Sequence, residues 1–373
     1  MSRPSWHRYW LPRQVHPGAW WSWALGLCLA ASWTTNPLLL GLLVAVAALV
    51  VVARRDDSPW ARSFGLYAGL GMAVVVLRVG YRVLLGGGDG QTVLVRLPEI
   101  PLPEITAGIR LLGPVTLEAV LAGLYDGLRL ATIIVVIGAA NALANPRRLL
   151  AGLPSALYEI GTVLVIVVTV FPQLGASLQR VRRAQRLRAP ARRGRLRLIR
   201  GIIVPVLTDA LDSAIAMAAS MDARGFGRTG TASPTHRRLV TGLMLVALVA
   251  FGAASYGLLT PQAPVLLRWP ALLVALASTV TALWWSGRDV RRSRYRPLPW
   301  RAAEVVVVVC GAAAAAGVLL VAGGEQAGLL NPQLLPVIEW PQLPVLALAG
   351  ALLALAPAAL TPRPRLASEG GVR

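Results

Sequence analysis

Residues 178–200 read LQRVRRAQRLRAPARRGRLRLIR, and residues 221–230 read MDARGFGRTG. Both runs belong to a basic stretch, 178–238, that holds fourteen of the chain's 37 basic residues and lies between long apolar segments. Hydrocarbon cannot take up this stretch, because one ionised side chain at a bilayer centre already costs about 3 kcal/mol. The stretch is therefore expected to be a water-exposed insert between two membrane parts.

The composition supports this division. Of 373 residues, 56% are hydrophobic and only 14% charged, and several apolar segments approach the roughly 20 residues that a membrane-spanning helix needs. The apolar residues do not alternate as they do in a membrane β-barrel. The net charge of +21 has a simpler explanation than nucleic-acid binding, because cytoplasmic loops of membrane proteins collect positive charge. The predicted fold class is an all-α polytopic membrane protein.

About eight transmembrane helices are predicted, four on each side of the insert. The apolar segments are residues 18–33, 38–53, 64–85, 115–143, 239–259, 265–285, 303–322 and 343–360. With both termini in the cytoplasm, the cytoplasmic regions hold 31 of the 37 Arg, the outer loops three and the helices three. This asymmetry favours four spans, a cytoplasmic insert and then four spans. The expected location of this multi-pass protein is the bacterial plasma membrane. The corresponding division is 1–150, a membrane part; 151–236, the insert; 237–362, a second membrane part; and 363–373, a cytoplasmic tail.

Three helices are predicted inside the insert. Residues 156–171 are almost wholly apolar, but basic residues flank them on both sides, which favours a helix that lies along the cytoplasmic face over one that crosses. Pro172 is expected to start or kink a second helix, 173–188. A third helix, 205–223, has an apolar stripe of Val206, Ala210, Ile215, Ala218 and Met221, and a wet side of Asp209, Asp212 and Asp222. Residues 86–113, rich in Gly and Pro, are expected to form an outer loop.

Enzymatic motifs are scarce. The sequence contains no GxxxxGK[ST] nucleotide-binding loop and no HExxH, and its two Cys lack metal-ligand spacing. Asp209 and Asp212 could hold Mg²⁺, although a water-exposed pair among arginines is the simpler reading. Asp126 and Arg129 lie within the fourth apolar segment, where charged residues are functional candidates and a structural intrahelical pair is equally expected. No metal and no cofactor are predicted.

The insert has a recognisable order of motifs. A GLRLA core at 127–131 and NPRRLLAGLP at 145–154 precede the apolar helix, AQRLRA at 184–189 follows it, and MDARGFG at 221–227 closes the insert. This order resembles the transmembrane coupling (T) component of energy-coupling factor transporters, the family that includes the cobalt transport permease. Its cytoplasmic helices end in two Ala-Arg-Gly motifs. Ala223, Arg224 and Gly225 match the second motif, and Ala184, Gln185 and Arg188 fit the first, although Leu187 and Ala189 replace its Ala and Gly.

The resemblance implies a scaffold with two kinds of partner. Two ABC-type ATPase subunits would bind the cytoplasmic helices, and a small membrane subunit that captures a vitamin or metal ion would pack against the spans. An Arg at a helix end suits such docking, because its guanidinium can pair bidentately with a carboxylate. The following Gly ends the helix and lets the side chain project. Either Arg could instead only interact with its own helix dipole, and the run 192–200 is expected to face lipid headgroups or water.

Two other classes of function stay open from the residues alone. A stand-alone secondary transporter would need broken helices and polar groups at mid-membrane, for which Asn36-Pro37 and the Asp126 and Arg129 pair are the best candidates. A membrane-embedded enzyme would use Asp209 and Asp212 with a metal.

Overall fold

The computed structural model describes residues 13–56, 63–84, 90–98, 100–101, 110–151, 158–187, 195–225, 234–260, 262–287, 300–334 and 338–362. Within these ranges the chain is almost wholly helical, and eight helices are long and apolar enough to cross a membrane. The prediction of an all-α polytopic membrane fold is confirmed. The eight include α6 and α7 of the predicted insert, and leave out α1, of 16 residues, and the short α11.

Most helix bounds lie within a few residues of the predicted segments. They are α1 (Pro17–Ser32), α2 (Pro37–Arg54), α3 (Phe64–Leu84), α4 (Leu117–Leu143), α5 (Pro146–Ala151), α6 (Tyr158–Leu187), α7 (Arg195–Ala223), α8 (Pro234–Leu259), α9 (Trp269–Ser286), α10 (Ala302–Ala322), α11 (Val345–Leu353) and α12 (Pro357–Leu360). The last predicted span is broken into α11 and α12, because Pro357 begins a new helix at its first position. Short 3-10 helices, η5 (Val265–Leu267) and η6 (Glu325–Leu330), precede α9 and follow α10.

The insert departs from the sequence prediction in its helix boundaries. Residues 156–171 and 173–188 were expected to be separate helices, but α6 continues through Pro172. Because proline has no backbone N–H, Pro172 removes the helical hydrogen bond to the carbonyl of Val168. The loss of this one bond does not end α6, which runs on to Leu187. The hydroxyl of Thr169 donates to the carbonyls of Val165 and Ile166, both at 2.9 Å. Likewise, α7 begins ten residues before the predicted start and contains Pro205.

The predicted outer loop contains short strands. They are β1 (Val93–Arg96), β2 (Ile100–Pro101), β3 (Arg110–Leu111) and β4 (Pro114–Thr116), which pair antiparallel as β1 with β4 and β2 with β3. Glu118, in the first turn of α4, accepts a hydrogen bond from the backbone N–H of Thr92 at 3.0 Å and thereby ties α4 to this segment. The strands were not predicted, because their few residues carry no alternating pattern.

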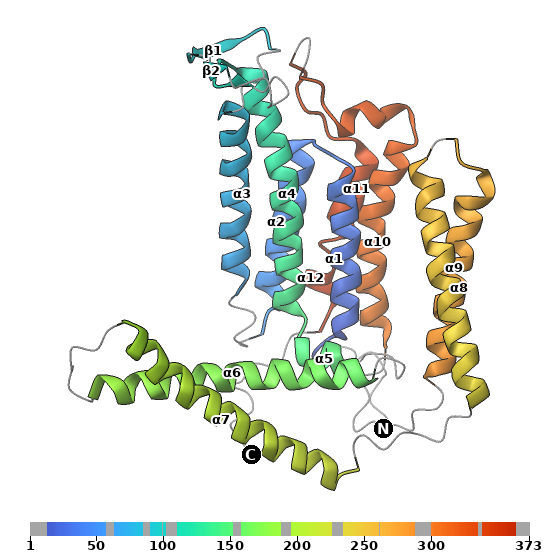
Figure 1. Cartoon of the computed structure of the whole chain (residues 1–373). Helices are drawn as coiled ribbons and strands as arrows, with labels where there is room; N and C mark the ends of the chain where they lie inside the picture. The colour runs from blue at the N-terminus through green and yellow to red at the C-terminus, as the bar shows by residue number, and fades with distance from the viewer. Residues whose placement is uncertain are drawn as a thin grey trace, which may run out of the picture. The chain divides into compact units, whose positions relative to one another are not determined.

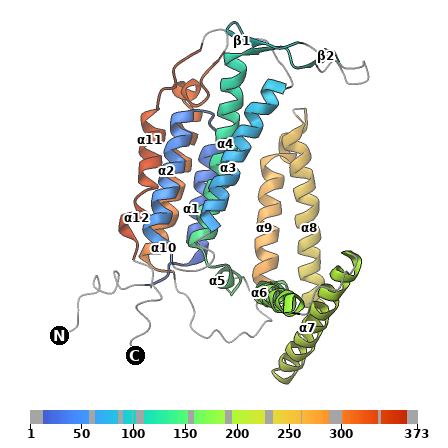
Figure 2. The same ribbon diagram turned by 90° about the vertical axis from the view of Figure 1, so that its left-hand side faces the viewer.

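The chain divides into two compact units: residues 1–149 with 298–373 (unit 1), and residues 150–297 (unit 2). In unit 1, α1 to α4, α10 and α11 run side by side as a bundle (Figures 1 and 2). In unit 2, α6 and α7 cross one another, and α8 and α9 form an antiparallel hairpin (Figure 1). The last two predicted spans therefore pack with the first four helices.

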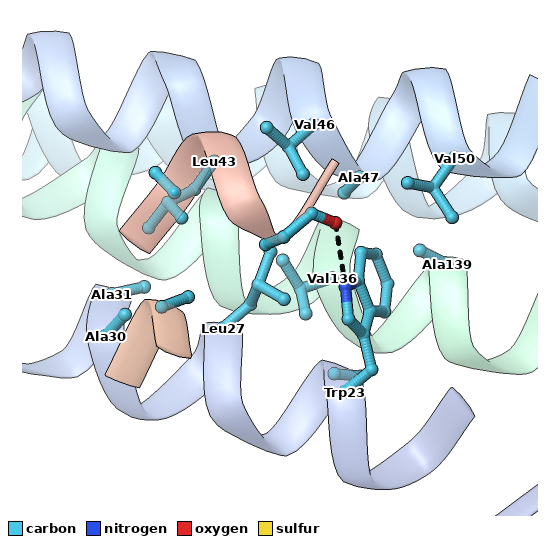
Figure 3. Packing of buried hydrophobic residues seen from close by; sticks show 14 of the residues in the cluster. Trp23, Leu27, Ala30, Ala31, Leu43, Val46, Ala47, Val50, Val136 and Ala139 are labelled. Atoms are coloured by element: carbon cyan, nitrogen blue, oxygen red, sulfur yellow. Dashed lines mark hydrogen bonds between the residues drawn. The ribbon is translucent and has the colours of Figure 1, made fainter. Parts of the chain in front are cut away.

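Glycines allow the helices of unit 1 to pack closely. A Cβ on Gly26 of α1 would lie 2.2 Å from the carbonyl oxygen of Gly311 on α10, and a Cβ on Gly311 would lie 2.4 Å from Cα of Trp23. Membrane helices use such small residues because lipid offers no hydrophobic force to hold two helices together, so dispersion contacts must do so. Figure 3 shows Trp23 and Leu27 among Leu43, Val46 and Val136. The Trp23 Nε1–H donates to the carbonyl of Ala354 at 3.1 Å.

Polar contacts fix both ends of α1 to the C-terminal part of the chain. At its start, Arg13 forms a bidentate pair with buried Glu304 of α10, at 2.6 and 3.0 Å. Beyond its end, the buried side chain of Asn36 caps α2 and donates to the carbonyls of Leu329 and Gln342, at 2.9 and 2.7 Å. Pro37 is the first residue of α2. Asn36-Pro37 thus begins a helix and does not break one, which removes a main support of the secondary-transporter hypothesis.

Candidate docking site at the ends of α6 and α7

The second Ala-Arg-Gly motif forms the C-terminal end of α7. Ala223 is the last helical residue, and the backbone N–H groups of Arg224 and Gly225 donate to the carbonyls of Met221 and Asp222, at 3.1 and 2.9 Å. Gly225 has φ +74°, in the left-handed region that favours glycine, so this residue is suited to end the helix. Arg224 is exposed. Its guanidinium can therefore reach a partner without first leaving an internal contact.

The first motif is at the end of α6, whose last residue is Leu187. Arg188 lies outside the described residues, and Leu187 is 88% exposed. Ala184 is exposed and Gln185 is half-buried. The Gln185 Nε2 donates to the carbonyl of Gly201 on α7, where a Cβ would lie 2.8 Å from that nitrogen. Gln185 was predicted to meet a partner; in the structure its amide connects α6 with α7.

A second polar contact joins the two helices. Buried Ser177 of α6 donates its hydroxyl to Asp209 Oδ2 of α7 at 2.6 Å, and Arg180 lies 3.6 Å from the same oxygen. The two contacts, at Gln185 and at Ser177, are eight residues apart on each helix, as two antiparallel helices require. Ser177, Arg180 and Asp209 also line a hollow of about 310 Å³ between the two helices. Ser177 was not predicted, because an apolar helix with one serine gives no indication of a partner on another helix.

The apolar stripe predicted for α7 is only partly covered. Val206, Ala210 and Met221 are half-buried, whereas Ile215 and Ala218 are exposed. Other large apolar side chains of this helix are also exposed: Ile203, Val204, Leu207 and Leu211. The helix therefore has an apolar surface that the described part of the chain leaves open.

Asp209 has a structural role in the contact between α6 and α7. Its carboxylate is already engaged by Ser177 and Arg180, and Asp212 is exposed. Among the described residues, no group of three His, Cys, Asp or Glu side chains is placed to hold a metal ion. The metal-dependent enzyme hypothesis has no support in this part of the chain.

Asp126 and Arg129 of α4 each contact a different helix. Asp126 Oδ2 lies 3.5 Å from an Nη atom of Arg82 on α3. Arg129 donates to the carbonyl of Ser32 at the end of α1. The two residues thus connect α4 to its neighbours on both sides, an arrangement that the i, i+3 spacing alone did not indicate.

The chain was compared with known protein families and with curated proteins. It matches the family described as cobalt transport protein (CbiQ) over residues 10–236, more than half of its length, a range that takes in all of α1 to α7. No curated protein matches the chain. The matched range includes both candidate docking motifs and the whole α6–α7 pair. This multi-pass membrane protein therefore belongs to the CbiQ family of cobalt transport proteins, and is a transporter component.

Proposed function

We propose that the chain is the transmembrane coupling subunit of an energy-coupling factor importer for a transition metal or a vitamin. Two ABC-type ATPase subunits bind the ends of α6 and α7, and a small substrate-binding membrane subunit packs against the spans. The observation that carries this proposal is the end of α7. There an exposed Arg224 is followed by Gly225 in the left-handed conformation, within a segment that the family match includes.

The proposal gives each region a task. The membrane parts, 1–150 and 237–362, form the scaffold in the bacterial plasma membrane, with both termini and the tail 363–373 in the cytoplasm. The region 151–236 carries the coupling helices. Closure of the ATPase dimer on ATP moves the ends of α6 and α7 together, and the crossing at Ser177 and Gln185 transmits this motion along both helices. The chain itself contains no nucleotide-binding loop of the GxxxxGK[ST] type.

The charge of the docking residues supports a protein partner. An exposed arginine at a helix end presents a planar fork of donors that matches a carboxylate in a groove of the partner, and a bidentate pair fixes both position and angle. The exposed apolar side chains of α7 between Ile203 and Ile215 supply dispersion contacts along the helix that leads to Arg224. Anionic lipid headgroups are the expected contact of the separate basic run 192–200.

Charge reversal at the two arginines tests this proposal. We expect Arg188→Glu with Arg224→Glu to abolish co-purification of the ATPase subunits, because two carboxylates would then repel the partner's carboxylates. Arg183→Glu, a change of the same charge at an exposed site on α6, should leave co-purification intact. The proposal is wrong if the double variant inserts into the membrane and still retains the ATPases. Substrate uptake by the chain alone in liposomes, without any ATPase, would instead favour a secondary transporter.

A further inference from the structure

The spans of unit 1 hold more positive than negative charge in one place. Arg78 and Arg82 of α3 lie beside Gly123, Asp126 and Gly127 of α4. Asp126 forms an ion pair with Arg82, and Arg129 of α4 donates a hydrogen bond to the carbonyl of Ser32 on α1. Arg78 is exposed and has no hydrogen-bond or ion-pair partner among the described residues. Two arginines of α3 thus lie beside a single carboxylate, so this surface of the helix pair has a surplus of one positive charge.

The chain offers Arg78 no unengaged carboxylate in the described spans of unit 1. Its eight predicted spans contain three acidic residues: Glu118, Asp126 and Glu304. Glu118 lies in the first turn of α4 and is bound by Thr92, and Glu304 lies in the first turn of α10 and is bound by Arg13. The hairpin of α8 and α9 contains no acidic residue. Within the described part of unit 1, no carboxylate therefore remains to neutralise Arg78.

Glycines of α4 hold Arg78 at the surface of the helix pair. A Cβ on Gly127 would lie 3.2 Å from Cβ of Arg78, and a Cβ on Gly123 would lie 3.0 Å from Cγ of Arg82. The stems of both arginines are thus fitted against α4 where it has no side chains. The guanidinium of Arg78 remains exposed beside the Arg82–Asp126 pair, and the positive surplus makes this surface unsuitable for a cation.

A carboxylate on a protein helix fits this position better than a lipid phosphate. Arg78 lies six residues before the end of α3, which corresponds to about 9 Å along the helix axis. Helical Cα–Cβ bonds tilt toward the helix N-terminus, so the side chain of Arg78 starts out away from the nearer membrane surface and not toward it. The guanidinium therefore reaches a lipid headgroup only with difficulty. An arginine without a charged partner at this depth in the membrane also costs free energy.

We propose that Arg78 binds an Asp or Glu carboxylate on a membrane-spanning helix of a partner subunit, which docks along the α3–α4 pair. The proposal rests on the proposed function for the existence of a membrane partner, but it does not use the docking of the ATPases. It adds the chemistry by which the partner is recognised. One acidic residue in the apolar part of the partner's helix forms an ion pair with Arg78 of α3.

The sequence permits a direct test, because the natural chain contains no lysine. Arg78→Lys places the only lysine of the chain at this position. In membranes from cells that express the full chain with its native partner subunits, dicyclohexylcarbodiimide activates a neighbouring carboxyl group as its O-acylisourea. The introduced amine attacks the acyl carbon, an amide bond forms, and the dicyclohexylurea leaves with the carboxyl oxygen. Mass spectrometry then identifies the linked peptide.

We expect Arg78→Lys to give an amide to an acidic residue within a membrane-spanning helix of another subunit. Arg82→Lys is the matched control and should link to Asp126 of the same chain, since their side chains are 3.5 Å apart in the natural pair. A link from position 78 only to acidic residues of the same chain, Asp126 among them, would overturn the proposal. No link from position 78 while the control reacts would also overturn it, because no carboxylate then lies within reach of this position. A link to a lipid would overturn it as well, because that result assigns Arg78 to the headgroups.

Co-purification of the ATPases is measured on the same samples. If Arg78→Lys links to the partner helix while the ATPases are absent, the membrane docking stands and the proposed coupling function fails. If the ATPases are present and position 78 gives no link to a partner helix, the coupling function stands and the docking of a carboxylate at Arg78 fails.

Discussion

The contact between α1 and α10 and the contact between α6 and α7 are built in opposite ways. The first is an apolar interface in which Gly26 and Gly311 bring two backbones together over buried side chains. The second depends on a few polar contacts, at Gln185 and at Ser177, beside a hollow and exposed apolar side chains. A close-packed interface has one arrangement, because any displacement forfeits many dispersion contacts. Two helices joined at a few points can change their angle at lower cost, which is what a coupling element needs.

The largest effect is expected from filling the close contact in unit 1. Gly311→Ala places a methyl group 2.4 Å from Cα of Trp23, and neither backbone can yield without opening the helix pair. We expect a loss of about 3 kcal/mol in stability, measured as a lower midpoint of thermal unfolding in detergent. Gly41→Ala is the matched control, since nothing lies within 4 Å of its Cβ position. It should be neutral, or gain up to about 1 kcal/mol through helix propensity.

Equal effects of the two substitutions would contradict the close packing of α1 on α10. The difference between them isolates the contact, because both replace a glycine in a long apolar helix by the same residue.

A smaller effect is expected at the crossing of α6 and α7. Asp209→Ala removes the acceptor of the Ser177 hydroxyl and the neighbour of Arg180. Because Asp209 and Arg180 are largely exposed, we expect a cost of about 1 kcal/mol, confined to unit 2. Hydrogen exchange should become faster along α6 and α7 and stay unchanged in α1 and α10. Faster exchange in α1 and α10 as well would show that the crossing supports the whole fold.

The sequence predicted the fold class and most helices well. Long apolar segments and the distribution of arginine are properties of neighbouring residues, and they indicated the long helices α1 to α4 and α10 of unit 1. The bounds of α6 were missed, because Pro172 was given more weight than the apolar run before it. A proline disfavours a helix locally, but it does not forbid one.

The site was predictable only where its geometry is local. Gly225 ends α7 through its own backbone angle, so Ala223-Arg224-Gly225 could be interpreted from the sequence. The contact from Gln185 to Gly201 and the contact from Arg82 to Asp126 depend on how two helices cross. The spacing of residues along a helix shows which side chains share a face. It does not show which of these faces is covered by another helix. For that reason Asp126 and Arg129 were predicted together although they have different partners.

The most direct test of the account is the distance between two spin labels in the assembled transporter, with ATP and with ADP. One label replaces Ala218 near the end of α7 and the other replaces Val52 at the exposed end of α2, in a chain in which Cys28 and Cys310 are changed to Ala. A second pair, at Val52 of α2 and Leu320 of α10, lies wholly within unit 1. The account predicts that ATP changes the first distance and leaves the second unchanged. Turnover of ATP and uptake of substrate with no change in the first distance would contradict it.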